Sequence, residues 1–373
     1  MKWPAVFWSA YSSLVTLDDL GWTPRLAELF GPYHTAGLMP ARVSLEHTHI
    51  YRVLSADGER LARVAGRLRH TAKTRAEFPA VGDWVAIEPV AAGAHSAETG
   101  RIRAVLPRSS RFSRRAAGNP AEEQVVAANV DLVLLVSGLD RDFNARRIER
   151  YLVTAWDSGA SPVIVLNKAD LVDDATPFVR EVEAMAQGVP VVAASVRWPD
   201  SIARVRARVG RGQTAALLGS SGVGKSSIAN ALIGEERLRT REVREGDGRG
   251  RHTSTNRQLV LLPGGGILID TPGMRELQLW DAGGAIADAF TDIDVLAAEC
   301  RFRDCRHRSE PGCAVIAAVG EGRLPEPRLG SFRKLQDEQA HQAAEQDERA
   351  RLDAKRQAKI LTKALERRLK EKR

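Results

Sequence analysis

Short apolar runs separated by polar turns fill the stretch between residues 41 and 106. Five of them have the length of strands, at residues 42–45, 50–54, 61–64, 84–87 and 102–106. The Asp57-Gly58 pair between the second and third runs is typical of a tight β-hairpin. Five short strands in so few residues predict a small all-β barrel, for which the oligonucleotide-binding (OB) fold is the natural candidate.

A different pattern begins at Asp131. Continuous apolar runs at residues 131–136, 162–166, 189–195, 214–218, 259–262 and 266–269 alternate with segments of helical character near 144–156 and 227–233. Unbroken apolar strands are the mark of a parallel sheet that is covered on both faces. The pattern therefore predicts an α/β domain, and the polar residues 119–124 are interpreted as the linker that leads into it.

A glycine-rich segment, Gly219–Ser226, follows the strand at 214–218 and opens a helix. It matches the G-x-x-x-x-G-K-[ST] phosphate loop, in which backbone N–H groups and the helix N-terminus face an anion. Lys225 is expected to reach the outer phosphates, and the Ser226 hydroxyl is expected to bind Mg²⁺. A Gly/Ser-rich turn with no ligand is the alternative, which the flanking strand and helix disfavour. The expected phosphate-contacting residues are Gly219, Ser220, Ser221, Gly222, Val223, Gly224, Lys225, Ser226 and Ser227.

The base that belongs to these phosphates is indicated upstream, at Asn167–Asp170. This N-K-x-D sequence ends a strand, and a carboxylate such as Asp170 can accept from both the ring N–H and the exocyclic amine of guanine. Asn167 can hold the loop, and the stem of Lys168 can lie over the ring. Ser195 and Val196 end the next strand, where a backbone N–H could meet the base, although Arg197 departs from the usual Ser-Ala-Lys. The expected base-contacting residues are Asn167, Lys168, Ala169, Asp170, Ser195 and Val196.

A third motif, D-x-x-G at Asp270–Gly273, ends the strand at 266–269. Asp270 is expected to hold the Mg²⁺ shell and the Gly273 N–H to meet the γ-phosphate, although both could simply be turn residues. In the polar loop before residue 258, Thr255 is the preferred Mg²⁺-binding threonine and Thr253 the alternative. Met274 stands where many small GTPases place a water-orienting glutamine, so we expect slow intrinsic hydrolysis.

The ionisable residue that best fits a catalytic role is His252 on the same loop, although a lone loop histidine is more often simply a surface residue.

These motifs occur in a circularly permuted order, because N-K-x-D precedes the phosphate loop. The order and the flanking segments resemble the ribosome small-subunit-dependent GTPase A family, and Pro79–Val85 is similar to one of its signatures. The resemblance implies a GTPase that assists late maturation of the small (30S) ribosomal subunit. It also implies binding to rRNA, slow hydrolysis stimulated by the subunit, and dissociation afterwards. A GTP-dependent RNA-binding switch without turnover, and a GTPase that acts on tRNA or the large subunit, stay open as alternatives.

The three cysteines of the chain all fall within fourteen residues and enclose a histidine. Three thiolates and one imidazole make a closed tetrahedral Zn²⁺ site, which is structural because no position stays open. An odd number of cysteines disfavours disulfides. The expected ligands are Cys300, Cys305, His307 and Cys313, in a small helical domain that the resembled family also carries.

Charge is concentrated at the C-terminus: residues 355–373 carry nine basic and two acidic residues, a net +7 of the chain's +8. Such a basic tail favours a polyanionic partner, although a solvated charged helix is the alternative. The barrel is expected to have basic rims, with Arg67, Arg69, His70, Lys73 and Arg75 in one loop and Arg108, Arg111, Arg114 and Arg115 further on. These rims favour RNA as a partner.

Several further expectations concern the whole chain. No apolar run is long enough to span a membrane, and Pro4 and three serines interrupt the mildly apolar stretch 3–17, so we expect a cytoplasmic protein without a signal peptide. We also expect a monomer. The predicted organisation is an N-terminal extension (1–40), an OB barrel (41–115), a GTPase domain (119–280), a zinc-binding helical domain (291–335) and a basic tail (336–373).

Overall fold

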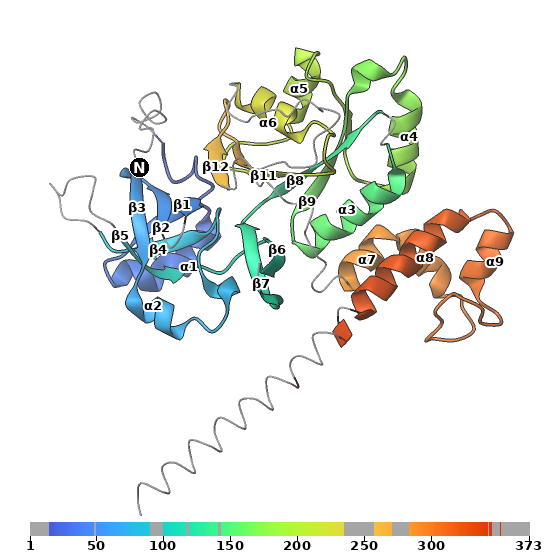
Figure 1. Cartoon of the computed structure of the whole chain (residues 1–373), viewed down its shortest axis with the longest axis horizontal. Coiled ribbons are helices and arrows are strands. Elements are labelled where there is room, and N and C mark those ends of the chain that lie inside the picture. Colours follow the sequence, from blue (N-terminus) through green and yellow to red (C-terminus); the bar gives the residue numbers. More distant parts are fainter. Residues whose placement is uncertain are drawn as a thin grey trace, which may run out of the picture. The chain divides into compact units, whose positions relative to one another are not determined.

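The structure is a computed structural model that describes residues 15–47, 50–89, 100–116, 119–140, 143–234, 257–270, 283–341, 343–344 and 351. The chain forms two compact units (Figure 1). The first comprises residues 1–115 and 122–278, and the second comprises residues 116–121 and 279–373.

A closed five-stranded barrel forms the N-terminal part of the first unit. Its strands are β1 (Met39–His47), β2 (Ile50–Ser55), β3 (Gly58–Val64), β4 (Trp84–Ile87) and β5 (Gly100–Val105). They follow the order β1-β2-β3-β5-β4, and β4 pairs with β1 to close the barrel. Strands β3 and β5 run parallel, whereas the other pairs are antiparallel. The predicted all-β barrel is therefore confirmed, with inward-facing side chains such as Val43, Val53 and Ile102 fully buried in its core.

Two expectations for the barrel rim were wrong. Residues 67–75 are not one loop, because helix α2 (Gly66–Thr71) and the 3₁₀ turn η1 (Arg75–Glu77) occupy most of that stretch. Arg108 is not a rim residue either. Its guanidinium binds both oxygens of the fully buried Asp83, at 2.8 and 2.7 Å, and donates to the backbone carbonyls of Ala76 and Phe78. Because a buried carboxylate needs a partner, Arg108 serves the fold and not the surface.

Six further strands form a sheet that is continuous with the barrel, because Gln258 pairs with Leu45 of β1. Its order is β10-β9-β8-β11-β13-β12, all parallel except β12. The strands are β8 (Leu132–Gly138), β9 (Ser161–Asn167), β10 (Val191–Ala193), β11 (Thr214–Leu218), β12 (Gln258–Leu261) and β13 (Ile267–Asp270). The predicted α/β architecture is confirmed. Strand β10 is shorter than predicted, because Pro190 cannot donate a ladder hydrogen bond and the Ser195 N–H turns to the Ser201 hydroxyl.

Helices cover both faces of this sheet, as the continuous apolar strands require. The four helices are α3 (Ala145–Asp157), α4 (Thr176–Met185), α5 (Pro199–Arg206) and α6 (Lys225–Ile233). Alternate residues of β8 belong to two hydrophobic cores, one on each face of the sheet. Val133 and Leu135 pack in the core with buried residues of α3 and α4, whereas Leu134 and Val136 pack in the core with those of α5 and α6. Figure 1 shows the helices on either side of the strands. Strand β8 is therefore buried on both sides.

The segment predicted as a linker is instead a strand. Residues 119–124 belong to β7 (Asn119–Ala128), which pairs with β6 (Arg111–Ala116). Cross-strand polar contacts account for its composition, because Ser113 donates to Glu123 at 2.6 Å and Arg114 donates to Gln124 at 3.3 Å. A polar sequence can thus form a hairpin when its side chains pair across the strands.

Arg42 of β1 holds the barrel to the N-terminal segment and to the residue that follows β7. Its side chain is buried and donates to the carbonyls of Leu20 (2.5 Å), Gly82 (3.1 Å) and Asn129 (3.0 Å). Burial lowers the pKa of Arg42 to about 10, so the guanidinium stays charged. The N-terminal segment that supplies Leu20 continues into α1 (Pro24–Thr35), whose N-cap Thr23 accepts from the Leu26 N–H. Three segments are therefore fixed around one side chain.

The second unit is helical. Its helices are α7 (Gly283–Ala289), α8 (Thr291–Ala297) and α9 (Ala314–Gly320), and residues 326–341 are helical as well. Phe290 and Phe332 form an edge-to-face pair at 5.4 Å in its small core. Among all described residues, no helix is both long and apolar enough to cross a bilayer.

Candidate functional site

The phosphate-loop segment connects β11 to α6, as predicted, and its glycines are required by close contacts. A Cβ atom on Gly219, which has φ of 155°, would lie 2.2 Å from the carbonyl oxygen of Val136. A Cβ atom on Gly224, which has φ of 93°, would lie 2.3 Å from the Asn167 amide nitrogen. Only glycine fits these positions, so the loop lies directly against the carboxyl ends of β8 and β9.

Lys225 begins α6 and folds over the loop. Its Nζ donates to the carbonyls of Gly219 at 2.7 Å and Ser220 at 2.5 Å. These contacts hold the ammonium group against the loop that leads into the N-terminus of α6. A cation and a set of backbone donors in one place can bind the negative charge of a polyphosphate.

The guanine motif lies beside this loop. Asn167 is buried, and its amide donates to the Val223 carbonyl at 2.7 Å, so it holds the loop as expected. Lys168 has a left-handed φ of 62° and pairs with Asp140 at 2.5 Å. The structure thus brings residues 167–170 and 219–225 together, although they are some fifty positions apart in the sequence.

Asp170 is held by two neighbours. Its Oδ1 accepts from the Ser195 hydroxyl at 2.6 Å, and its Oδ2 lies 3.4 Å from the guanidinium of Arg197. Val196 between them is exposed, and Ala169 is fixed by a backbone bond to Ala194 at 3.1 Å. Asp140 and Arg197 were not assigned a role from the sequence. No local motif marks Asp140, and its position after β8 is the one signal it offers.

Asp270 ends β13, next to β11 in the sheet. Burial raises the pKa of Asp270 to about 6, and the charge of Lys225 acts in the opposite direction. A half-buried carboxylate at a strand end, within electrostatic reach of a lysine, suits a site that gains a divalent cation. His252, Thr253, Thr255, Gly273 and Met274 lie outside the described residues, so their roles stay predictions.

A second site lies in the helical unit, where the four predicted metal ligands meet. The ligand atoms of Cys300, Cys305, His307 and Cys313 all lie within 4.8 Å of one another. The Sγ atoms of Cys300 and Cys313 are 3.8 Å apart, and Nδ1 of His307 lies 3.6 and 3.4 Å from them. A tetrahedral ion with Zn–S bonds of about 2.3 Å separates two sulfurs by about 3.8 Å and a sulfur from a nitrogen by about 3.5 Å. The arrangement therefore fits zinc, and the sulfurs are too far apart for a disulfide.

The local backbone supports this ligand set. His307 adopts a left-handed φ of 56° that turns its ring inward, and burial lowers its pKa, which favours the neutral ring that a metal requires. Cys313 caps α9, since its sulfur accepts from the Ile316 N–H at 3.5 Å. Two ligands are thus fixed by a tight turn and by a helix start.

Strand β9 with the guanine motif precedes β11 with the phosphate loop, and Asp270 ends the neighbouring β13. This arrangement defines a circularly permuted GTPase. The family model described as RsgA GTPase matches residues 105–280. The chain belongs to the RsgA GTPase family, which confirms the resemblance inferred from the sequence.

Individual relatives agree over nearly the whole chain. A "Small ribosomal subunit biogenesis GTPase RsgA" of Opitutus terrae is 51% identical over 338 residues, which cover 89% of this chain and 92% of that protein. Its namesake in Streptomyces coelicolor is 43% identical, with 94% of each chain covered. Among solved structures, YjeQ from Thermotoga maritima matches with a TM-score of 0.59 and 27% identity, covering 81% of this chain and 99% of that one. YloQ, titled a circularly permuted GTPase, matches in fold with a TM-score of 0.57 and 23% identity, over 82% and 96%.

Proposed function

We propose that the protein hydrolyses GTP in the service of small ribosomal subunit assembly. The observation that carries the proposal is the junction of the guanine motif with the phosphate loop through Asn167 and Val223. The relatives named above supply the biological context, since their names assign them to biogenesis of that subunit. We also infer that the protein acts in the cytoplasm, as the site of small-subunit assembly, and that it is a monomer.

Within the site, each residue has a separate role. Asp170 would accept the ring N–H and the amine of guanine, Lys225 would bind the outer phosphates, and the loop N–H groups would surround the phosphate chain. Ser226, Thr255 and Asp270 would hold Mg²⁺, which supplies charge neutralisation on the phosphates. His252 and the Gly273 N–H would act near the γ-phosphate, and hydrolysis would be slow because Met274 cannot orient water.

The helical unit offers a surface for RNA beside the proposed zinc site. Arg301, Arg303, Arg306 and Arg308 are all exposed, and Phe302 between them is 41% exposed. The Arg301 guanidinium lies 5.5 Å from the Phe302 ring centre. Cations beside a partly exposed aromatic ring suit phosphates and an unstacked base. We infer that this loop contacts rRNA and that zinc gives the loop its shape.

Single-turnover GTP hydrolysis with and without purified small subunits tests the function. Stimulation by small subunits, but not by large subunits or tRNA, is the expected result. Lys225→Ala serves as the inactive control, because it removes the phosphate-binding charge. Equal rates with and without small subunits would contradict the proposed function.

A further inference from the structure

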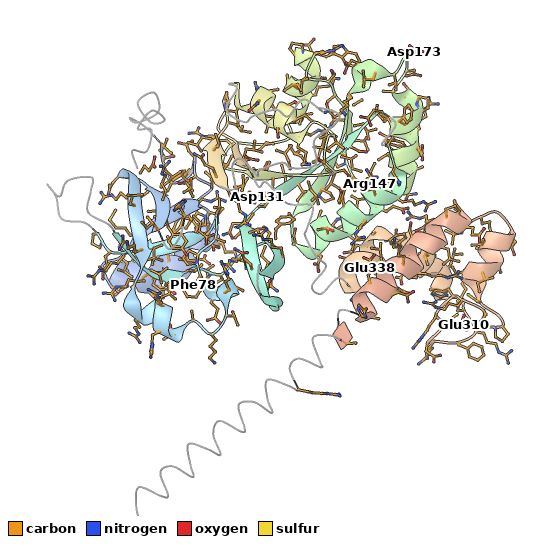
Figure 2. All side chains as sticks on the ribbon, viewed as in Figure 1. Phe78, Asp131, Arg147, Asp173, Glu310 and Glu338 are labelled. Carbon is orange, nitrogen blue, oxygen red and sulfur yellow. The ribbon has the colours of Figure 1, made fainter. Side chains whose placement is uncertain are left out.

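Ser220, the second residue of the phosphate loop, is held from outside the loop by helix α3. The guanidinium of Arg147 donates to the Ser220 hydroxyl at 3.0 Å, and the Tyr151 hydroxyl lies 3.1 Å from the same oxygen. Arg147, labelled in Figure 2, and Tyr151 are one helical turn apart and therefore lie on one side of α3. Neither residue belongs to a nucleotide-binding motif.

The helix that presents them is firmly placed. Asn144 caps α3 by accepting from the Arg147 N–H at 3.2 Å, while Ile148 and Leu152 are 2% exposed against the sheet. The ring of Tyr151 packs against the same core. Two side chains on a packed helix can hold a loop atom more precisely than side chains of another loop could.

Ser220 also connects this contact to Lys225. Its carbonyl accepts from Lys225 Nζ at 2.5 Å, while its hydroxyl is bound by α3. The neighbouring Gly219 rests against Val136 of β8. One residue thus has its side chain fixed to α3 and its backbone fixed to the cation that meets the phosphates.

We propose that Arg147 and Tyr151 are positioning residues for GTP hydrolysis, which act through Ser220 on the phosphate loop and on Lys225. The proposal rests on the GTPase activity proposed above. A loop of glycines and serines has many backbone conformations, and fixing one of them before the nucleotide arrives lowers the entropic cost of binding. Donors already aimed at the phosphates also stabilise charge that develops in the transition state. Neither role requires Arg147 or Tyr151 to touch the nucleotide.

The test compares single-turnover hydrolysis at saturating GTP, GDP affinity and the thermal midpoint of the full-length protein. Arg147→Gln removes a charge-assisted hydrogen bond and is expected to lower the rate about tenfold, while Tyr151→Phe removes a neutral one and is expected to lower it about fivefold. GDP affinity should fall in the same order. Arg150→Gln, an equal charge change at an exposed position of the same helix, should leave the rate and the GDP affinity unchanged.

A double-mutant cycle separates positioning from simple support of the fold. In a Ser220→Ala background, Tyr151→Phe and Arg147→Gln should add little to the loss, because the shared oxygen is already absent. Ser220→Thr, which keeps the hydroxyl, should retain most of the activity. Rates within twofold of the unmodified protein, or losses that add fully in the Ser220→Ala background, would overturn the proposal. An unmodified protein that neither binds nor hydrolyses GTP would instead overturn the proposed function.

Discussion

Replacing Asp170 with asparagine should change the base that the protein accepts from guanine to xanthine. The environment of Asp170 determines how the new amide lies. The Ser195 hydroxyl, 2.6 Å from Oδ1, donates a hydrogen bond that only the amide oxygen can accept. Ser195 should therefore keep the oxygen in the place of Oδ1 and direct the NH₂ group to the place of Oδ2. In the proposed pose guanine would present its amine at that place, whereas xanthine would present a carbonyl.

The size of the effect follows from the contacts that are lost. A carboxylate accepting from guanine makes charge-assisted hydrogen bonds of about 1.5–3 kcal/mol each. Losing one of these bonds, and placing the new NH₂ donor against the amine donor of guanine, should cost about 3–4 kcal/mol, or about 10²–10³-fold in affinity. The ion pair with Arg197 also disappears. Because the Arg197 side chain is 75% exposed, this pair should contribute little.

The effect is measured by competition with GTP, XTP and ATP. In the unmodified protein they displace a fluorescent guanine nucleotide, and in the variant they displace a fluorescent xanthine nucleotide. Asp170→Asn should prefer XTP over GTP, and the double variant with Ser195→Ala should prefer it less, because the amide is then free to turn over. Arg197→Gln is the matched control, since it removes the exposed partner of Asp170 and should keep the preference for GTP. A GTP affinity in Asp170→Asn within tenfold of the original, or ATP competing as well as GTP in the unmodified protein, would refute the assignment of the base.

Three further predictions concern the other parts of the chain. Burial raises the pKa of Asp270 to about 6, so the ionised fraction of this carboxyl falls as the pH drops below 6, and Mg²⁺-dependent hydrolysis should weaken by up to about tenfold per pH unit there. Asp270→Asn should remove this pH dependence. An unchanged pH profile in that variant would contradict the prediction. Gly224→Ala should abolish nucleotide binding, because its Cβ atom would lie 2.3 Å from the Asn167 amide nitrogen. Gly222→Ala should lose much less nucleotide affinity, because no atom lies within 4 Å of a Cβ atom there. Equal losses of affinity in the two variants, measured by titration, would argue against the close contact. Removing zinc with a chelator should unfold the helical unit, which hydrogen exchange would detect, and should leave the GDP affinity within about twofold of the original. If protein purified without a chelator contained no zinc, the metal site would be contradicted.

The sequence predicted those parts of the structure that depend on local patterns. Short apolar runs between polar turns predicted the barrel, and continuous apolar runs predicted the parallel sheet. Each nucleotide motif falls at the end of the strand assigned to it. The four candidate metal ligands were predicted because all the cysteines of the chain lie close together in the sequence, and the structure brings them together. Such features can be predicted from the sequence because residues close together in the chain determine them.

Contacts between distant segments could not be predicted in this way. Arg108 is indistinguishable by composition from the surface arginines near it, and only the fold shows that it neutralises the buried Asp83. Arg147 was likewise one charged residue of an amphipathic helix until α3 was placed beside Ser220. The polar start of β7 was misread as a linker because its partners lie on β6. In each case the missing information was which side chain lies opposite.

Circular permutation leaves the nucleotide site intact because its contacts run between strand ends and not along the chain. Val136 of β8 supports Gly219, and Asn167 of β9 holds Val223, although both strands precede the loop in this order. The permuted order does matter where β12 joins the parallel strands to the barrel. There Gln258 of β12 pairs with Asp270 on one side and with Leu45 of the barrel on the other. A single residue therefore separates the carboxylate proposed to hold Mg²⁺ from the first barrel strand, so a displacement of either one must strain hydrogen bonds of β12.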